Sequence, residues 1–164
     1  MTDPGPQIPS LSALAWLAGR WQATVPGLPN DCPVEPQDFT SELDLLAPLG
    51  GFLPGIWRVG RESVTLISIR EIDGTLEWCQ QEFSSGLVPV PNSFPLVLRL
   101  HRSEDRGIVF ESIGETGHSR VKVMRLELVL LEPNVLVLRF HAQDASGAWI
   151  TVREAAHRLA ARSA

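Results

Sequence analysis

Short segments in which polar and apolar residues alternate, separated by turn signals about every 8–12 residues, constrain the fold of this chain most strongly. Residues 39–45 and 120–130 alternate cleanly, which places their successive side chains on opposite faces of a strand. Asp73-Gly74 joins two further segments and is the strongest hairpin signal in the chain. No helical pattern separates the strands, as parallel crossovers would require. The pattern therefore predicts an all-β antiparallel meander of about eight to ten strands that forms a barrel or a sandwich.

The two ends of the chain and one inner segment depart from this pattern. Residues 1–10 hold three prolines and a glycine and are predicted to be a flexible N-terminal tail, which leaves 11–164 as one barrel domain. A short helix is expected next, capped by Ser10 or Ser12 and ended by Gly19. Residues 52–59 predict only a weak strand, because Pro54-Gly55 interrupts them. Residues 154–162 fit a helix or a strand, and we expect a strand that closes the barrel and frays near Arg162.

Composition limits the partners that this chain can have. Its 164 residues are 44% hydrophobic, which suits one globular domain with a sizeable core. Lys and Arg total 14 against 19 Asp and Glu, and this net charge of −5 argues against binding to nucleic acids or anionic membranes. Residues 1–10 have neither part of a signal peptide, and no segment is apolar enough to span a membrane, so a cytoplasmic protein is expected. Cys32 and Cys79 are accordingly predicted to be reduced thiols.

The strongest resemblance to known proteins lies in residues 14–21 (LAWLAGRW), a short helical segment followed by a Gly-x-Trp motif. This segment resembles the entry to calycin-type barrels, a superfamily that includes lipocalins, fatty-acid-binding proteins and nitrobindin-like haem proteins. It is most similar to uncharacterised bacterial calycin-like families that begin Leu-Ala-Trp-Leu-Ala-Gly-x-Trp, and later strand segments resemble theirs as well. The resemblance implies a barrel plugged at one end by Gly19 and Trp21, with Arg153 or Arg158 stacked on the tryptophan ring.

The same resemblance raises the question of haem. The nitrobindin-like branch binds haem through a histidine on a late strand, and His157 stands in a comparable place. That branch usually continues Gly-x-Trp-x-Gly-x-Gly, whereas this chain has Ala23 and Val25 at the two later glycine positions. These departures favour a solvated His157 near a fraying terminus, with no cofactor. Haem ligated by His157 stays open as the alternative.

One expected strand suggests where a ligand would bind. Alternation places Leu76, Trp78 and Gln80 on one face, and an apolar, aromatic surface with a few polar groups is typical of ligand pockets. Trp57, in another expected strand, is a further candidate for this lining. Plain core packing is the competing interpretation for each tryptophan.

Two arginines are candidate anchors for an anionic group of the ligand. Arg58 lies in an expected strand, and Arg139 shares a face with apolar residues of another. An arginine on an apolar face needs a partner, which for Arg139 is either Glu127 or a ligand carboxylate.

Other chemistry finds little support in the sequence. His101, His118 and His141 come from separate segments and show no metal-ligand spacing, so no metal site is predicted. There is no Gly-x-Ser-x-Gly elbow, and Cys79 sits within an expected strand, where an inert thiol is the default. No catalytic residue is assigned.

The sequence therefore predicts a calycin-like barrel that binds a small apolar or amphipathic molecule. The alternatives are a haem protein and an enzyme of unknown reaction on the same barrel. The pattern leaves open whether the interior is hollow or filled by side chains. Edge strands or a barrel seam would let two copies pair as a homodimer.

Overall fold

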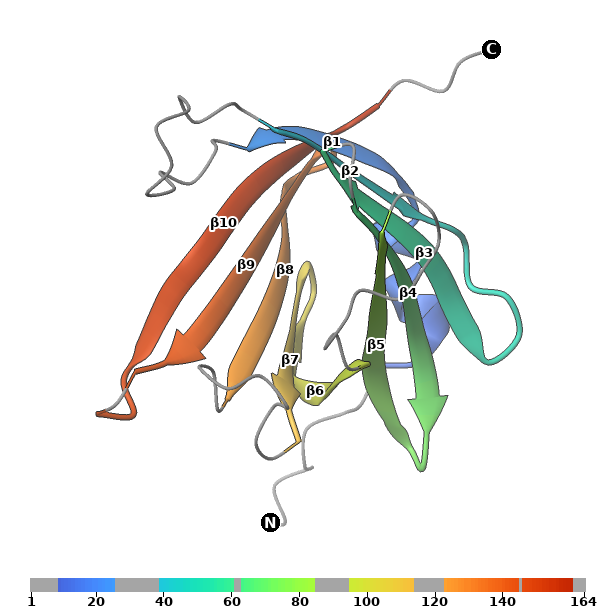
Figure 1. The fold of residues 1–164 in the computed structure, drawn as a ribbon. Helices are drawn as coiled ribbons and strands as arrows, with labels where there is room; N and C mark the ends of the chain where they lie inside the picture. Colours follow the sequence, from blue (N-terminus) through green and yellow to red (C-terminus); the bar gives the residue numbers. More distant parts are fainter. Residues whose placement is uncertain are drawn as a thin grey trace.

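The computed structural model describes residues 9–25, 39–60, 63–84, 95–113, 123–144 and 146–160. In these ranges the chain forms ten antiparallel strands that close into one barrel, and one short 3-10 helix (Figure 1). The helix is η1 (Leu11–Leu17), and the strands are β1 (Gly19–Val25), β2 (Phe39–Leu45), β3 (Phe52–Val59), β4 (Ser63–Ile72), β5 (Thr75–Ser84), β6 (Leu96–Glu104), β7 (Gly107–Ser112), β8 (Met124–Glu132), β9 (Val135–Gln143) and β10 (Trp149–Leu159). The prediction of an all-β antiparallel barrel with one N-terminal helix is confirmed.

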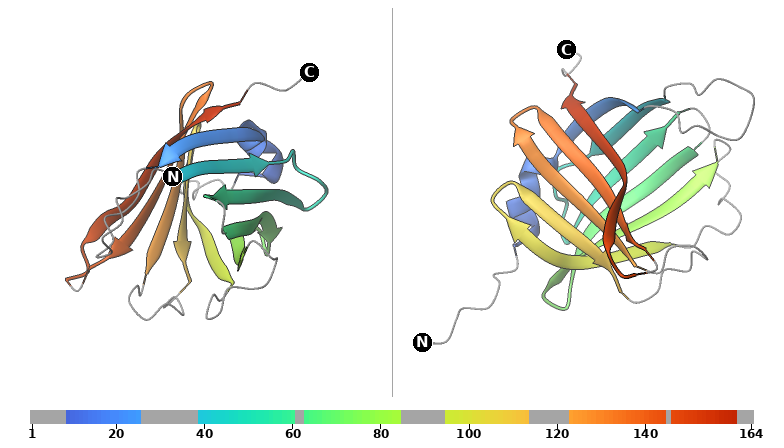
Figure 2. Two further views of the ribbon diagram at one scale, coloured as in Figure 1. Left: turned by 45° about the horizontal axis from the view of Figure 1, so that its top comes forward. Right: turned by 90° about the vertical axis from the view of Figure 1, so that its left-hand side faces the viewer.

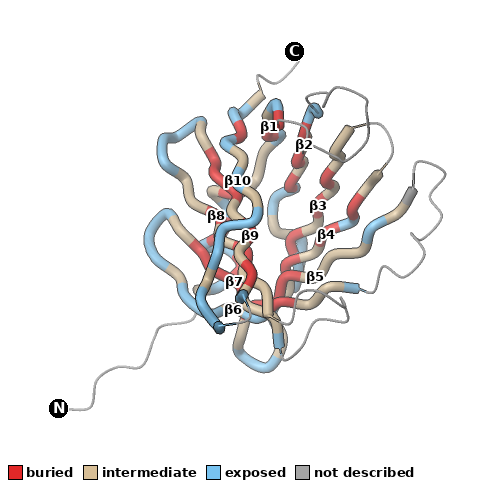
Figure 3. The backbone as a smooth tube through the Cα atoms, turned by 60° about the vertical axis from the view of Figure 1, so that its left-hand side comes forward, coloured by how far each residue is buried: buried red, intermediate tan, exposed pale blue. Residues whose placement is uncertain are grey.

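Neighbouring strands in the barrel follow chain order from β2 to β10, and β1 closes the ring by pairing with both β2 and β10. Along the strands, buried residues alternate with more exposed ones (Figure 3). In β2, for example, Ser41, Leu43 and Leu45 are buried and the residues between them face outward. The sequence alternation thus sorts side chains between the interior and the outer wall, as a period of two requires. No helix within the described residues has the length and hydrophobicity needed to span a membrane.

The helix and the start of β1 fill one end of the barrel, which we call the plug end. In the right-hand view of Figure 2 the helix lies on the left, beside the β6–β7 and β8–β9 connections. Leu14 and Leu17 of the helix are buried, and Trp21 is 1% exposed with its indole Nε1 donating to the Leu17 carbonyl at 2.9 Å. Gly19 has a φ of +155°, which residues with a side chain rarely adopt, and a Cβ there would lie 2.6 Å from Leu159 Cδ1, so both backbone and packing favour glycine.

The helix cap differs in detail from the expectation. Ser10 occupies the N-cap position, but its hydroxyl bonds to the hydroxyl of Ser12 at 2.7 Å rather than to a backbone N–H. The helix is accordingly a short 3-10 turn held by the burial of its leucines.

Two strands are more regular than the sequence suggested. Pro54-Gly55 does not interrupt β3, which pairs continuously with β4. Gly55 faces inward where a Cβ would overlap the Leu45 side chain, and the Pro54 carbonyl accepts from Leu46 N at 2.9 Å. At the end of the chain, the expected strand is confirmed and β10 runs to Leu159. Arg162, where fraying was expected, lies outside the described residues.

Oppositely charged side chains alternate across the outer wall. Arg70, Glu77 and Arg99 are direct cross-strand neighbours on β4, β5 and β6, and Glu77 pairs with both arginines at 3.2 Å. The same row continues to Glu111 on β7 and Arg125 on β8, which pair at 2.6 Å. A shift of one residue in any of these strands would turn its charges into the interior, so this row favours the observed register.

Candidate functional site

The interior of the barrel has two halves with different packing. In the plug half, most inward side chains are buried completely or nearly so, as with Leu76, Trp78 and Phe110 at 0% exposure, although Leu159 at the rim is 42% exposed. At the opposite end, which we call the far half, several inward side chains keep partial exposure; they are Ala23, Val59, Gln80, Leu96, Met124, Arg153 and Ala155. Side chains therefore fill the plug half, and the far half is where a ligand would find accessible surface.

A buried chain of hydrogen bonds crosses the far half. Ser41 Oγ lies 2.8 Å from His157 Nε2, and the indole Nε1 of Trp57 donates to the same Oγ at 2.8 Å. His157 Nδ1 lies 3.3 Å from the carbonyl oxygen of Ala155. Because the indole can only donate and the carbonyl can only accept, the chain is satisfied when Ser41 donates to Nε2 and His157 carries its proton on Nδ1. The arrangement therefore holds a neutral His157.

Burial reinforces the neutral state of this histidine. Ser41 and His157 are both 0% exposed. Desolvation by burial lowers the pKa of His157 below its ordinary value and outweighs the opposing effect of the hydrogen bond to Ala155. The interpretation of His157 as a solvated residue near a fraying terminus is therefore wrong, because closure of the barrel turns it inward.

An aromatic stack borders the same hydrogen bonds. The rings of Trp57 on β3 and Phe140 on β9 are parallel within 1°, with centroids 5.6 Å apart. The pair offers an apolar surface beside Ser41 and His157. Both rings are mostly buried, at 7% and 8% exposure.

Two hydrogen-bond donors in the far half face the interior with no acceptor among the described residues. Arg153 is the register partner of Phe140, so its side chain is on the inner face, and no described residue forms an ion pair or hydrogen bond with it. Gln80 accepts from Trp78 Nε1 at 2.8 Å through its Oε1, which leaves its amide NH2 group uncommitted. Both groups can donate to a bound molecule.

The arginines of the outer wall differ from Arg153 in this respect. Each of seven other arginines pairs with at least one carboxylate; they are Arg20, Arg58, Arg70, Arg99, Arg102, Arg125 and Arg139. Arg106 and Arg158 have no such pair among the described residues, but both are exposed to water. Arg153 thus combines partial burial, an inward direction and the lack of a described partner.

The predicted ligand residues fall into two groups. Leu76, Trp78, Gln80 and Trp57 all face the interior, although Leu76 and Trp78 lie in the packed plug half. Arg58 lies on the outer wall, where it pairs with Glu42 at 3.1 Å.

Arg139 also lies on the outer wall, with Glu127 and Glu154 as partners. The hydrogen bond to Glu154, and to a smaller extent the one to Glu127, raises the pKa of the Arg139 guanidinium above its ordinary value. Its partners are therefore protein carboxylates, including the Glu127 that the sequence suggested. Neither Arg58 nor Arg139 faces the interior.

The predicted barrel plug is also divided by the structure. Gly19 and Trp21 lie at the plug end, but Arg153 does not stack on Trp21. In the register of β1 and β10, Trp21 faces Leu159, six positions beyond Arg153 and so about 20 Å further along the strand. Arg158 lies opposite Gln22 and faces outward.

Sequence reasoning did not select Ser41 or Phe140 for the site. For Ser41 a signal exists, because it is the one polar residue on the inward face of its strand between apolar neighbours. A buried hydroxyl at such a position requires a partner, and here it has two. Phe140 carries no comparable signal, since an apolar residue in an apolar strand reads as core.

The haem that the resemblance implies would require His157 as its iron ligand. A histidine binds haem iron through a ring nitrogen with a free lone pair. Nδ1 of His157 is directed to the Ala155 carbonyl, and the Ser41 hydroxyl occupies the position in front of Nε2 while Trp57 holds it there. The residues as arranged do not fit an axial iron ligand.

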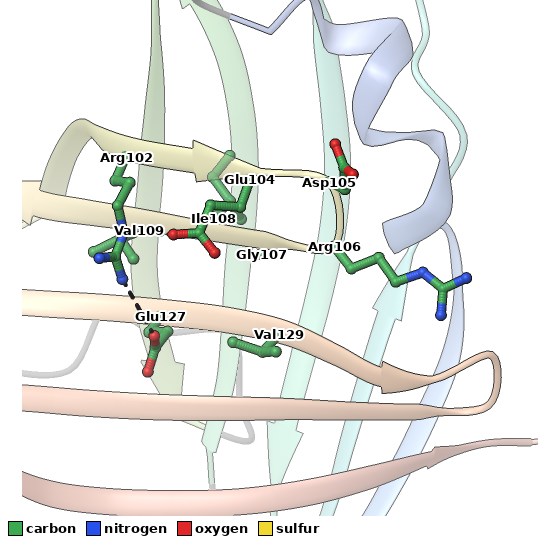
Figure 4. A pocket seen from close by; sticks show the side chains of 9 residues that line it. All are labelled: Arg102, Glu104, Asp105, Arg106, Gly107, Ile108, Val109, Glu127 and Val129. Carbon is green, nitrogen blue, oxygen red and sulfur yellow. Dashed lines mark ion pairs between the residues drawn. The ribbon is translucent and has the colours of Figure 1, made fainter. Parts of the chain in front are cut away.

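Hollows also lie on the outer surface and at one rim of the barrel. One, of about 440 Å³, lies on the outer wall over β6, β7 and β8, where Arg102 and Glu127 already face each other at 3.9 Å (Figure 4). A second, of about 890 Å³, lies at the rim of the plug end, beside Gly19 and Leu159. Among the described residues, no group of three or more His, Cys, Asp or Glu could hold a metal ion. His101 and His141, for which the sequence predicted no metal role, lie outside the interior and approach carboxylates, and His118 is not among the described residues.

Comparison with known proteins adds no assignment. No protein-family model matches this chain, and no curated protein matches its sequence. The closed ten-stranded antiparallel barrel with an N-terminal helix is consistent with a calycin-like fold. Function must therefore be argued from the interior itself.

Proposed function

We propose that this calycin-like barrel binds a small amphipathic molecule in the far half of its interior, with an anionic head group held by Arg153. The observation that carries the proposal is Arg153 itself, an inward-facing, partly buried residue with no ion-pair or hydrogen-bond partner among the described residues. A cation in such a place loses hydration, and an anionic ligand restores its interactions.

The rest of the far half suits the same ligand. Val59, Leu96, Met124 and the stack of Trp57 on Phe140 supply apolar surface for a hydrocarbon body. Gln80 adds a second donor on the opposite wall. Ser41 and His157 are committed to each other, whereas Arg153 and the Gln80 amide are donors without an acceptor among the described residues, which favours a head group with acceptor oxygens.

The proposal predicts a preference by charge that binding measurements can test. A hydrogen bond to a charged group contributes about 1.5–3 kcal/mol, against about 0.5–1.5 kcal/mol for a neutral one. Dodecanoate should therefore bind roughly tenfold tighter than dodecan-1-ol, and dodecyltrimethylammonium should bind weakest. Dodecyl phosphate in the same titration separates carboxylate from phosphate preference.

Arg153→Gln should abolish the preference for dodecanoate over the alcohol while leaving alcohol binding nearly unchanged. Arg158→Gln is the matched control, because Arg158 lies on the same strand but faces water. Equal binding of all three amphiphiles to the parent protein, or the same loss in both variants, would refute the role of Arg153.

A native mass spectrum and an absorbance scan of the purified protein come first. An extra mass of an anionic amphiphile supports the proposal. A Soret band, lost in His157→Ala, would instead establish the haem alternative. The enzyme alternative gains no support from Ser41 and His157, because both are fully buried and are committed to each other.

A further inference from the structure

The seam between β1 and β10 is the shortest ladder in the barrel. Only Trp21 and Gln22 of β1 pair with β10, opposite Leu159 and Arg158, whereas β4 and β5 pair over ten positions. One further backbone bond, from Ala160 N to Arg20 O at 2.8 Å, lies at the same end. Figure 1 shows the two strands meeting near the C-terminal end of β10 and diverging along it.

Side chains connect the barrel where this ladder stops. Ser41 on β2 and His157 on β10 bond across β1, the strand that lies between them. Ala23 is the register partner of Ser41 on β1, and its small side chain leaves the path between them free. In a regular sheet the outer two of three strands are about 10 Å apart, a span that a serine and a histidine side chain can bridge together.

The far part of β10 has little else to hold it on this side. Seven of the eleven residues of β10 are exposed, including Ile150 at 47% and Val152 at 50% in its far part, and Figure 3 shows the strand mostly in the exposed colour. Its backbone pairs on one edge with β9, with a bulge between Thr151 and Arg153. Segments with few buried contacts open most easily.

We propose that the seam between β1 and β10 is the part of the barrel that opens, and that the Ser41–His157 hydrogen bond is a latch that protonation of His157 releases. A protonated His157 carries N–H on both nitrogens and can no longer accept from Ser41. Ser41 Oγ would then accept from both Trp57 and His157, which leaves the Ser41 hydroxyl hydrogen without the acceptor that it has in the closed latch. A buried imidazolium gains hydration when the seam opens.

The charges around the latch also disfavour a protonated His157. The nearest inward charge on the strand of His157 is Arg153, which is positive. The neighbouring strands present only uncharged side chains to His157, namely Ala23, Ser41, Trp57 and Leu136. Glu82 of β5 and Glu71 of β4 also lie on the inward face, but both are exposed, Glu82 at the far rim and Glu71 at the plug end. No described carboxylate therefore contacts an imidazolium at position 157, and the closed latch favours neutral histidine.

Hydrogen exchange with NMR detection tests the latch directly and does not depend on any ligand. Long-range ¹H–¹⁵N spectra report the tautomer and protonation of His157, and amide exchange reports opening. On acidification from about pH 7.5 to about pH 5, protection of the Ala160 amide, which donates across the seam to Arg20 O, should fall at least about tenfold more than that of the β4–β5 hairpin and of the Leu159 amide, which donates to Asn134 on the β9 side, after correction for intrinsic rates. The fall should follow the protonation of His157.

His157→Gln is the decisive variant, since glutamine can accept from Ser41 but does not titrate. Its seam protection should be independent of pH. If this variant does not fold, Ser41→Ala serves instead, and should show low seam protection already at neutral pH. Unchanged seam protection while His157 titrates, the same acid loss in His157→Gln, or a His157 that stays neutral until the whole barrel unfolds would each overturn the proposal.

Discussion

The plug half and the far half of the interior are built from the same alternating strands but bury different groups. In the plug half Trp21, Trp78 and Phe110 are at most 1% exposed and pack only against apolar neighbours or satisfied partners. In the far half a serine and a histidine are buried together, and an arginine faces inward without a described partner. The comparison indicates that one end supplies the stability that lets the other keep polar groups, which cost stability but can recognise a ligand.

The largest effect should come from removing the plug. Trp21→Ala should lower the free energy of unfolding by about 3–5 kcal/mol, because it deletes a buried indole and leaves a cavity. Val59→Ala in the far half should cost no more than about 1.5 kcal/mol, since Val59 is only partly buried. Urea unfolding measures both. Equal losses in the two variants would mean that the halves do not differ in packing.

Breaking the buried polar chain should have the next largest effect. Ser41→Ala leaves the Trp57 indole without its acceptor and Nε2 of His157 without its donor, so it should cost about 1–3 kcal/mol in urea unfolding. Thr24→Ala, on the exposed face of β1, should stay within about 0.5 kcal/mol of the parent. If the two substitutions cost the same, the chain contributes nothing to stability.

Acid should weaken the parent protein through His157. Burial lowers the pKa of this group in the folded state, so below a pH of about 6.5 the unfolded chain binds more protons than the folded one. The free energy of unfolding should therefore fall as pH decreases through this region, and the fall should be smaller in His157→Gln. Urea midpoints across pH, measured on both proteins, check the sign. Parallel curves would remove His157 as the cause.

Substitutions on the outer wall should have the smallest effect. Arg58→Gln and Arg139→Gln each remove a partly exposed ion pair, so each should cost less than about 1 kcal/mol, and less still in about 0.5 M salt. Both should leave dodecanoate affinity within about twofold of the parent, since neither side chain faces the interior. A large loss of affinity in either variant would show that ligand recognition extends to the outer wall.

Several features of this molecule follow from local sequence. Alternation in residues such as 39–45 determines which side chains share a face, and Asp73-Gly74 determines a hairpin, because both signals act between near neighbours. The alternation of side chains along a strand also places Trp57 and Arg58 on opposite faces of β3. Adjacent residues of a strand face opposite sides, so the two could not both line the interior.

Tertiary structure decided the roles of other residues, because those roles depend on which distant segments meet. In the sequence, Gly55 indicates a break in the strand. In the structure, a Cβ at this position would overlap the Leu45 side chain, so glycine lets β3 continue past Leu45. Arg153 was placed beside Trp21 by resemblance, and the register of β10 puts it at the opposite end.

The clearest case is the latch, whose two residues are 116 positions apart and share no local signal. Each strand by itself determines only that Ser41 and His157 point to the same side as its apolar residues. Closure of the ring through β1 decides that they meet, since hydrogen bonding between remote side chains depends on strand order and register rather than on pattern.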